Sequence, residues 1–379
     1  MSMKITILGT AYPYRGGLAA FNERLAKEFQ NEGDEVEIIT FTLQYPDFLF
    51  PGKTQFSSEP APSDLDIERR VSSVNPFNWW KVGREIAKDE PDLLVVKYWL
   101  PFMAPCFGTI ARIVRRNGKT KVVSILDNII PHENRLGDKL LSDYWVGSVD
   151  AFVAMSQSVL NDLSLFDREK PRVFCEHPLY DNFGKGIGKD AALTRLGLSA
   201  DFSYILFFGF IRDYKGLDIL MEAMTDQRIR KRNVKLLVAG EFYNNSKAYS
   251  DLEKTLNIAD KILWFNDFIP DGEVTNFFSA ADMVVQPYKS ATQSGVTQIA
   301  YHFEKPMLVT NVGGLPEIVP NGRVGYVTNV DSKEVADAII DFYENNRHDS
   351  FVENIKEEKK KYAWSRMTGA VKSALNLRE

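Results

Sequence analysis

Several features that mark particular classes of protein are scarce or missing in this sequence. Cysteine occurs twice and histidine four times in 379 residues. Cys106 and Cys175 stand far apart, without a CxxC motif or a Cys/His cluster. This excludes a disulfide scaffold and a zinc site, and a reducing compartment fits. The longest uncharged stretch, residues 98–111, is shorter than the roughly 20 apolar residues that span a membrane, and prolines interrupt it.

An excess of positive charge is also missing. Lys and Arg total 46 against 51 Asp and Glu, a formal net charge of -5, so no global attraction to nucleic acid is expected. The first residues enter a β-branched run without a basic or long apolar segment, so we expect no secretory signal and a cytoplasmic location. The hydrophobic fraction of 44% is ordinary for a globular protein. The length predicts two domains.

Short apolar runs alternate with longer stretches of helical period, a pattern typical of βαβ units and a mainly parallel sheet. Residues 18–32 place apolar side chains at spacings of three and four, which predicts a helix with one apolar face. The sequence therefore predicts two Rossmann-type domains. Strands of the first are expected at Lys4–Leu8, Val36–Thr40, Leu93–Val96, Lys121–Leu126 and Ala151–Ala154, and of the second at Tyr204–Phe208, Val234–Ala239, Lys261–Phe265, Met283–Gln286 and Met307–Thr310.

The predicted boundaries are residues 1–180 for the first domain, 181–202 for a glycine-containing linker without strong period, and 203–350 for the second domain. Residues 351–379 are expected to be helical, and their packing against the first domain is a hypothesis. Two doubly wound domains would place the carboxyl ends of both parallel sheets on either side of one cleft, where ligands bind. Functional residues are therefore sought in the strand-end loops.

The loop after the first strand, Gly9–Gly17, precedes a predicted helix. Gly16 and Gly17 at a helix start would let an anion approach backbone N–H groups at the positive end of the helix dipole. The spacing is not GxGxxG, so the dinucleotide fingerprint of a dehydrogenase is not satisfied. A glycine loop that serves only to turn the chain remains the alternative.

The loop after the first strand of the second domain carries two cations. Arg212 supplies a planar fork of donors and Lys215 a mobile point charge, both just before a predicted helix. This arrangement suits a diphosphate. The alternative is a pair of solvated surface cations.

Two further loops follow strands of the second domain. The first opens a helix with small polar residues and amides, which suit an anion and sugar hydroxyl groups. The second places Glu317 after a diglycine turn, where a capping role and ligand contact are both open. The residues of the first of these loops are Gln293, Ser294, Gly295, Val296, Thr297 and Gln298.

Motifs in these loops resemble those of the group 1, or family 4, glycosyltransferases of the GT-B fold. The order and spacing match over most of the second domain, and two segments extend the resemblance to the first. The matching segments are Phe208–Gly216, Val238–Gly240, Ser279–Asp282, Lys305–Pro306, Val312–Val319, Arg15–Gly17 and Asn128–Glu133.

The resemblance implies a GT-B enzyme that moves a sugar from a nucleoside diphosphate sugar to an acceptor with retention of anomeric configuration. It further implies that the second domain holds the donor, that the first is the acceptor side, and that neither a metal nor a further cofactor is needed. Arg212 and Lys215 would stabilise the leaving diphosphate. Gly16, Gly17, the loop of residues 293–298 and Glu317 would complete the donor site.

The sequence departs from the family pattern at three places. The family usually has two glutamates in the loop that corresponds to residues 293–298. Both are absent here, and the segment contains Gln293 and Gln298. The arginine usual after the strand-end glycine is Phe210, so Arg212 would reach the same phosphate. A histidine usual at the end of a first-domain strand is Asp127, which we expect on the reacting face of the sugar. His132 is the other candidate there, and a turn or capping role for Asp127 stays open.

The acceptor side is less defined. A basic cluster follows the uncharged stretch beside three aromatic residues, which suggests contact with the cytoplasmic face of the inner membrane and a lipid-linked acceptor. An ordinary buried strand followed by a solvated helix is the alternative. Trp79 and Trp80 would line the acceptor site or merely pack. The cluster comprises Arg112, Arg115, Arg116, Lys119 and Lys121, with Trp99, Phe102 and Phe107.

The sequence thus favours a cytoplasmic hexosyltransferase of cell-surface polysaccharide or glycolipid assembly, with a glycan or lipid-linked acceptor and no nucleic-acid partner. Two alternatives remain. The missing glutamate pair suggests a silent nucleotide-sugar-binding scaffold, and a GT-B nucleotide-sugar epimerase would convert the donor without an acceptor.

Overall fold

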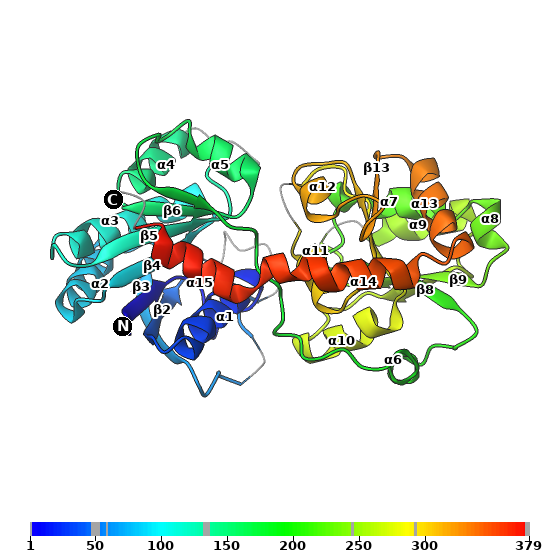
Figure 1. Ribbon diagram of the computed structural model, residues 1–379, viewed down its shortest axis with the longest axis horizontal. Helices are drawn as coiled ribbons and strands as arrows, with labels where there is room; N and C mark the ends of the chain where they lie inside the picture. Colours follow the sequence, from blue (N-terminus) through cyan, green and yellow to red (C-terminus); the bar gives the residue numbers. More distant parts are fainter. Residues whose placement is uncertain are drawn as a thin grey trace. The chain divides into compact units, whose positions relative to one another are not determined.

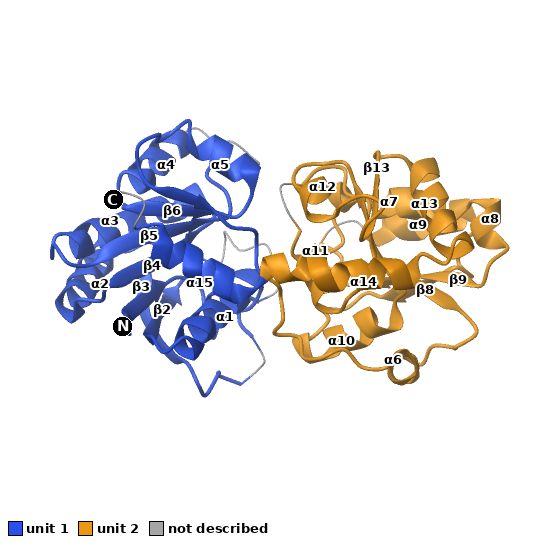
Figure 2. Ribbon diagram, viewed as in Figure 1, with its two compact units in different colours: residues 1–178, 363–379 blue, residues 179–362 orange. Residues whose placement is uncertain are grey.

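A computed structural model describes residues 2–46, 54–57, 60–131, 137–243, 246–291 and 294–375 (Figure 1). The chain divides into two compact units (Figure 2). Unit 1 comprises residues 1–178 and 363–379, and unit 2 comprises residues 179–362. Each unit contains one parallel sheet covered by helices, so the predicted α/β class with two Rossmann-like domains is confirmed.

The sheet of unit 1 has seven strands in the order β3-β2-β1-β4-β5-β6-β7, and its neighbouring strands are parallel. Parallel neighbours need crossover connections, which helices provide. The strands are β1 (Lys4–Leu8), β2 (Glu35–Leu43), β3 (Asp66–Ser72), β4 (Leu93–Tyr98), β5 (Lys121–Leu126), β6 (Ala151–Ala154) and β7 (Arg172–Phe174). The helices include α1 (Gly17–Asn31), α2 (Pro76–Asp89), α3 (Ala104–Arg115), α4 (Asp138–Val146), α5 (Gln157–Leu163) and α15 (Trp364–Ser373).

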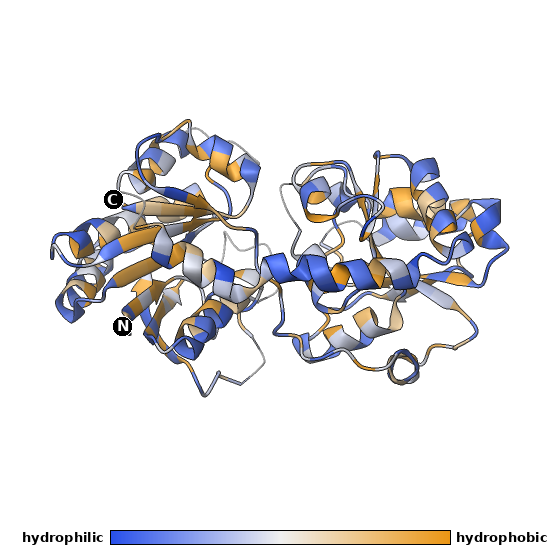
Figure 3. Ribbon diagram, in the orientation of Figure 1, coloured by the Kyte–Doolittle hydropathy of each residue, from blue (hydrophilic) through white to orange (hydrophobic). Residues whose placement is uncertain are grey.

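Apolar residues fill both faces of this sheet. In β4, Leu94 and Val96 belong to the cluster that includes buried residues of α2 and α3, whereas Leu93 and Val95 pack with residues of α1 and α15. The alternation follows because successive side chains of a strand point to opposite faces. Figure 3 shows the same division, with hydrophobic residues on the strands and hydrophilic residues on the outer helix faces. A strand buried on both faces is expected to be apolar throughout.

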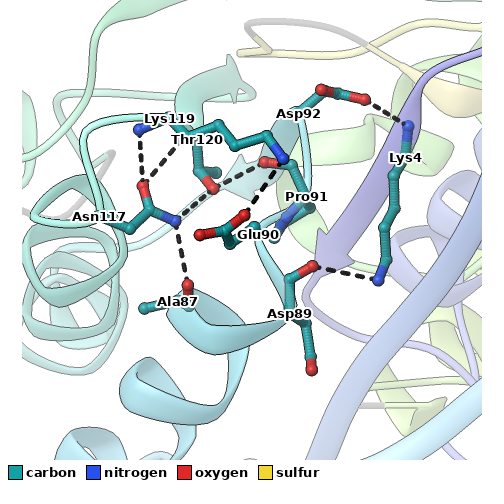
Figure 4. Close-up of polar contacts among 9 residues, drawn as sticks. All are labelled: Lys4, Ala87, Asp89, Glu90, Pro91, Asp92, Asn117, Lys119 and Thr120. Atoms are coloured by element: carbon teal, nitrogen blue, oxygen red, sulfur yellow. Dashed lines mark hydrogen bonds and ion pairs between the residues drawn. The ribbon is translucent and has the colours of Figure 1, made fainter.

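The amino edge of the unit 1 sheet is tied together by turn residues (Figure 4). The amide of Asn117 donates to the hydroxyl of Thr120 at 2.8 Å, and that hydroxyl donates to the carbonyl of Pro91 at 2.6 Å. The Lys4 N–H donates to the carboxylate of Asp92 at 2.8 Å. These bonds join the turns that precede β1, β4 and β5, so the polar groups at this edge serve the fold, and a ligand site is sought at the opposite, carboxyl edge.

The helix near the C-terminus belongs to unit 1. In Figure 1, α15 (red) lies beside α1 (blue), and the two helices are in contact. The rings of Phe21 and Trp364 lie 5.1 Å apart, and Lys372 pairs with Glu32 at 2.7 Å. The preceding helix α14 (His348–Glu358) belongs to unit 2. The expected C-terminal helix is therefore two helices in different units.

The sheet of unit 2 has six strands in the order β10-β9-β8-β11-β12-β13, again with parallel neighbours. Its strands are β8 (Ser203–Phe208), β9 (Val234–Ala239), β10 (Ile262–Phe265), β11 (Met283–Gln286), β12 (Met307–Thr310) and β13 (Gly325–Thr328). Its helices also include α6 (Lys189–Leu196), α7 (Leu217–Ala223), α8 (Gln227–Arg230), α9 (Ser246–Leu256), α10 (Asp271–Ala280), α11 (Gly295–His302), α12 (Leu315–Ile318) and α13 (Ser332–Glu344).

Residues 181–202, expected to link the domains, lie within unit 2. The Ile187 N–H donates to the hydroxyl of Ser279 at 3.1 Å, and the Thr275 hydroxyl donates to the carbonyl of Lys185 at 3.0 Å. Helix α6 also contacts α10. The segment is therefore packed against the helical layer of unit 2, and the chain passes between the units at residues 178–179 and 362–363.

Candidate functional site

Three strand-end loops meet at the carboxyl edge of the unit 2 sheet. The Ile211 N–H donates to the carbonyl of Glu241 at 2.9 Å, and the Tyr243 N–H donates to the carbonyl of Ile211 at 3.1 Å. These bonds join the loop after β8 to the loop after β9. The Lys289 N–H donates to the carbonyl of Tyr214 at 2.7 Å, which adds the loop after β11. The sequence predicted two of these three loops, those after β8 and β11, as parts of the site.

Glycines allow these backbones to approach closely. A Cβ at Gly216 would lie 1.9 Å from the carbonyl oxygen of Pro287, and a Cβ at Gly240 would lie 2.2 Å from the carbonyl oxygen of Gly209. Their φ angles are 68° and 144°, in the region that favours glycine. No larger residue fits either position without moving backbone.

Lys215 and Arg212 occupy the first of these loops. The Lys215 side chain is buried, with 9% of the residue exposed, and its burial lowers the pKa of the amine to about 8, with a further contribution from Arg212. The Arg212 guanidinium lies 3.9 Å from the centre of the Tyr243 ring. Neither cation forms an ion pair within the described ranges, so two positive charges stand together at the sheet edge.

Two carboxylates of the same region pair with a different cation. The ammonium of Lys289 lies 2.9 Å from an oxygen of Asp213 and 2.9 Å from an oxygen of Asp218. These two carboxylates therefore bond Lys289 and not Arg212 or Lys215. Neither Arg212 nor Lys215 has an ion pair among the residues that the structure describes, which suits an anionic ligand.

The loop before α11 matches the expected anion cradle only in part. The Ser294 hydroxyl accepts from the Val296 N–H at 3.2 Å, and the Thr297 N–H donates to the Ser294 carbonyl at 3.3 Å. Two of the N–H groups expected to bind phosphate thus already have partners within the protein, as in an ordinary N-cap. The Gly295 N–H has none among the described residues. Gly295 is also required sterically, because a Cβ there would lie 2.9 Å from the Tyr180 ring.

Gln298 and Gln286 are buried amides without hydrogen-bond partners in the described chain. Each is 1% exposed, and both polar atoms of each side chain are unpaired. Gln286 ends β11 and Gln298 lies in α11. Gln298 was expected near the sugar or ribose, whereas Gln286 was not singled out, although an amide ending an apolar strand was a visible signal. Gln293 lies outside the described residues.

Glu317 lies in the short helix α12 and is exposed. Its side chain makes no hydrogen bond or ion pair with any residue in the described ranges, and the start of α12 has no side-chain cap. The capping role that the sequence left open is therefore not observed.

In unit 1, Gly16 precedes α1 with a φ of 102°, and no atom lies within 4 Å of the position of a Cβ there. Its conformation requires glycine, and Gly17 begins the helix. The preceding backbone pairs with residues 54–57, since the Arg15 N–H donates to the carbonyl of Gln55 at 3.0 Å. Among the described residues, the loop thus has both a backbone conformation that favours glycine and open space at the Cβ position of Gly16.

Asp127 lies just after β5, also at the carboxyl edge of its sheet. One carboxylate oxygen is 3.1 Å from the ammonium of Lys97, a residue of β4 that is 2% exposed. Burial lowers the pKa of Lys97, while Asp127 opposes that shift. His177, which follows β7, is also buried there, and burial with the nearby Lys97 charge lowers its pKa to about 3. His132 lies outside the described residues.

The aromatic residues expected at a membrane surface pack within unit 1, whereas four of the five basic residues, Arg112, Arg116, Lys119 and Lys121, are exposed. Phe107 is buried, and Trp99 and Phe102 pack partly buried against the same core cluster. Arg115 pairs with Asp150 at 2.6 Å. The aromatic side chains thus pack as in an ordinary folded segment, and contact of the basic residues with a membrane stays a prediction.

Of the remaining basic residues, Lys119 and Arg112 have described side-chain contacts, and Trp79 and Trp80 lie in α2. Lys119 pairs with Glu90 at 3.3 Å, and the Arg112 side chain donates to Ser148 at 2.8 Å. Trp79 packs against the core, whereas Trp80 is 55% exposed. Across the described ranges no helix is long and apolar enough to cross a membrane, and no group of three His, Cys, Asp or Glu side chains could hold a metal ion.

Comparisons with known proteins agree with this arrangement. The family described as Glycosyltransferase Family 4 matches residues 15–175, and that described as Glycosyl transferases group 1 matches residues 203–345. An uncharacterized glycosyltransferase of Methanocaldococcus jannaschii is 24% identical over 98% of this chain and 97% of its own. A D-inositol 3-phosphate glycosyltransferase of Thermobifida fusca is 25% identical over 82% of this chain and 76% of its own.

Solved structures show the same fold. The Anabaena protein HepE in complex with UDP superposes with a TM-score of 0.74 at 15% identity, covering 99% of this chain and 100% of that one. HepE has also been solved with UDP-glucose. At this level of identity the likeness establishes the fold.

Proposed function

Because this chain belongs to the group 1, family 4 glycosyltransferases, we propose that it transfers a sugar from a nucleoside diphosphate sugar to a glycan or lipid-linked acceptor. Retention of anomeric configuration is part of the proposal. We further place the reaction in the cytoplasm, in the assembly of cell-surface polysaccharide or glycolipid, with peripheral contact to the inner membrane.

One observation carries the proposal for the donor. Lys215 and Arg212 stand together at the carboxyl edge of β8 without an ion pair among described residues, while the nearby Asp213 and Asp218 pair with Lys289 instead. A buried amine beside a guanidinium attracts a dianionic group more strongly than exposed cations do, because water screens the interaction less. A diphosphate is the part of a nucleotide sugar with this charge.

The same residues serve the chemical step. As the bond between the sugar and the diphosphate breaks, negative charge accumulates on the leaving oxygen. Arg212 presents a fork of donors and Lys215 a single ammonium, and both are held in place before the reaction by the loop contacts. We propose that these cations supply the stabilisation that a divalent metal gives in other enzymes. The Gly295 N–H and the space above Gly16 would receive further phosphate oxygens.

On the other side of the reaction, positive charge develops on the sugar ring in an oxocarbenium-like state. We assign Asp127 to that face, where a carboxylate oxygen would stabilise the charge. His132 stays a second proposal for the same role. Gln293, Gln298 and Glu317 are assigned to the sugar and ribose hydroxyl groups, since amide and carboxylate oxygens accept hydrogen bonds from them.

Two other functions use the same donor site. The missing glutamate pair favours a silent scaffold that binds nucleotide sugar without turnover, and an epimerase would convert the donor alone. Product analysis separates the three. The wild-type protein is incubated with UDP-glucose, GDP-mannose and ADP-glucose, with and without a membrane extract as acceptor source, and the products are identified by mass spectrometry and NMR. Transfer predicts an acceptor-dependent glycoside, epimerisation predicts a new nucleotide sugar, and a scaffold predicts unchanged donor.

A further inference from the structure

Strand β4 carries a lysine in the middle of an apolar core. Lys97 is 2% exposed, and its neighbours Val95 and Leu93 on the same face belong to the cluster with α1 and α15. It pairs in register with Ile125 of β5. Burying an ammonium costs free energy that a hydrophobic residue of similar size would avoid. Packing alone therefore does not account for a lysine at this position.

The ammonium of Lys97 contacts one carboxylate and one aromatic ring. Its ammonium lies 3.1 Å from one carboxylate oxygen of Asp127 and 3.3 Å from the centre of the Phe21 ring in α1. The aromatic face attracts the cation, and the carboxylate neutralises it. His177 is the other titratable group facing this charge, and its ring lies 5.3 Å from that of Phe21. The described chain offers Lys97 no second carboxylate.

The pair is arranged asymmetrically. Lys97 is enclosed, whereas 23% of the Asp127 side chain is exposed. The ammonium holds one carboxylate oxygen, and the other has no partner among described residues. The Asp127 N–H donates to the carbonyl of Tyr98 at 2.9 Å, so the backbone beside the carboxylate is also fixed. Because Asp127 follows β5, this partly exposed side chain lies at the carboxyl edge of the sheet, where ligands bind in open α/β folds.

We propose that Lys97 is a positioning residue for sugar transfer: it fixes the orientation of the Asp127 carboxylate and leaves one oxygen to face the sugar. The inference rests on the proposed function, because Asp127 matters only if transfer occurs. Lys97 acts through Asp127 and does not touch the substrate. The same pair explains why the strand keeps a charged residue, since a catalytic carboxylate loses rate when its orientation is free.

The test compares Lys97→Met, which keeps the volume without the charge, with Lys97→Arg, which keeps a donor for Asp127. Asp127→Asn and the double variant complete a cycle. Lys170→Met is the matched control, because Lys170 is also partly buried in unit 1 but bonds the carbonyl of Val146 instead of the Asp127 carboxylate. The kcat, the KM for the donor, the Kd for UDP and the melting temperature are measured for each, with UDP-glucose as the first probe.

We expect Lys97→Met to lower kcat by about tenfold or more while the donor KM and the Kd for UDP stay within about twofold. Adding Lys97→Met to Asp127→Asn should cause no further loss, and Lys97→Arg should retain more activity than Lys97→Met. The Lys170→Met variant should keep wild-type kcat. If Lys97→Met is too unstable to assay, Lys97→Gln takes its place, because a neutral amide also removes the charge, and reduced kcat with unchanged UDP binding is again expected.

Four results would overturn the inference. Additive losses in the double variant would show that Lys97 does not act through Asp127. Equal kcat of wild type and Lys97→Met, or of wild type and Lys97→Gln where only that variant folds, would show that the ammonium does not orient Asp127. If wild type transfers sugar but Asp127→Asn is fully active, the transferase function holds and the role of Lys97 is rejected. If wild type turns over no nucleotide sugar, both proposals are rejected.

Discussion

The ammonium of Lys215 lies 3.1 Å from the point where a Cβ on Gly209 would stand. The absence of a side chain at residue 209 thus gives the lysine its place at the end of β8. Gly209 has a φ of 96°, so its backbone also favours glycine. Residue 209 therefore favours glycine for two reasons, the space needed by the Lys215 ammonium and the positive φ. Substitutions can distinguish the two effects.

We predict that Gly209→Ala weakens UDP binding by about tenfold, because the methyl group displaces the ammonium. The positive φ should also lower the free energy of unfolding by about 1–2 kcal/mol. Gly197→Ala is the control: Gly197 has a φ of 66°, with nothing within 4 Å of its Cβ position. It should lose similar stability but no UDP affinity. Calorimetric titration and thermal unfolding measure the two effects, and equal affinities in both variants would contradict the role of Gly209.

The affinity for nucleoside diphosphate should fall as the pH rises above 8. Burial lowers the pKa of free Lys215 to about 8, and a bound diphosphate favours the charged form, so binding at higher pH must take up a proton. The Kd for UDP should rise by up to about tenfold per pH unit between roughly pH 8 and 10. Titrations in buffers of different ionisation enthalpy measure the proton uptake. Lys215→Arg should remove this pH dependence because arginine stays charged, and an unchanged slope would exclude Lys215 as its source.

The protein should lose stability in mild acid through His177. Its pKa is about 3 in the folded protein against 6.5 for the free side chain, so the unfolded state binds more protons between those values. Stability is therefore complete above about pH 6.5 and falls with decreasing pH by up to about 1.4 kcal/mol per unit. Urea unfolding at several pH values measures the slope. His177→Gln should flatten it, whereas His348→Gln, which removes an exposed histidine of α14, should not. Equal slopes in both variants would contradict this assignment.

Removing Asp127 should destabilise unit 1 more than removing the whole ion pair. Asp127→Asn leaves the enclosed Lys97 charge without its carboxylate, and we expect a loss of about 2 kcal/mol in the free energy of unfolding. The loss is moderated because Asp127 is partly exposed. Adding Lys97→Met removes the unpaired charge and should recover about half of the loss. Chemical denaturation of the single and double variants tests this, and a double variant less stable than Asp127→Asn would refute it.

The sheet framework followed largely from local patterns. The runs Lys4–Leu8, Lys121–Leu126 and Val234–Ala239 form strands with the predicted bounds, because continuous apolar segments in a parallel sheet need no information from distant residues. Three edge strands, β3, β7 and β13, were not predicted. In β3 most side chains are at least partly exposed, and β7 and β13 have three and four residues. None has the long apolar run that marks a central strand.

Less of the candidate site than of the sheets could be predicted from the sequence. Arg212 and Lys215 could be identified from their spacing after a strand, but the burial of Lys215 depends on glycines and loops distant in the sequence. The predicted strand at Leu93–Val96 stopped before Lys97, because a charge normally marks a strand end. The observed strand continues to Tyr98, and Asp127, 30 positions further along the chain, supplies the charge that makes this possible. A pairing of this kind cannot be inferred from either segment alone.

The most direct test of the account is a thermal-shift titration of the wild-type protein and Lys215→Met with UDP, GDP, ADP and their common sugars. A ligand that binds only the folded state raises the melting temperature by mass action. The account predicts a saturable rise for one nucleotide and its sugar in wild type, and its loss in Lys215→Met without a comparable change in the unligated melting temperature. No shift with any nucleotide at about millimolar concentration, or equal shifts in both proteins, would contradict the assignment of Arg212 and Lys215 as the diphosphate site.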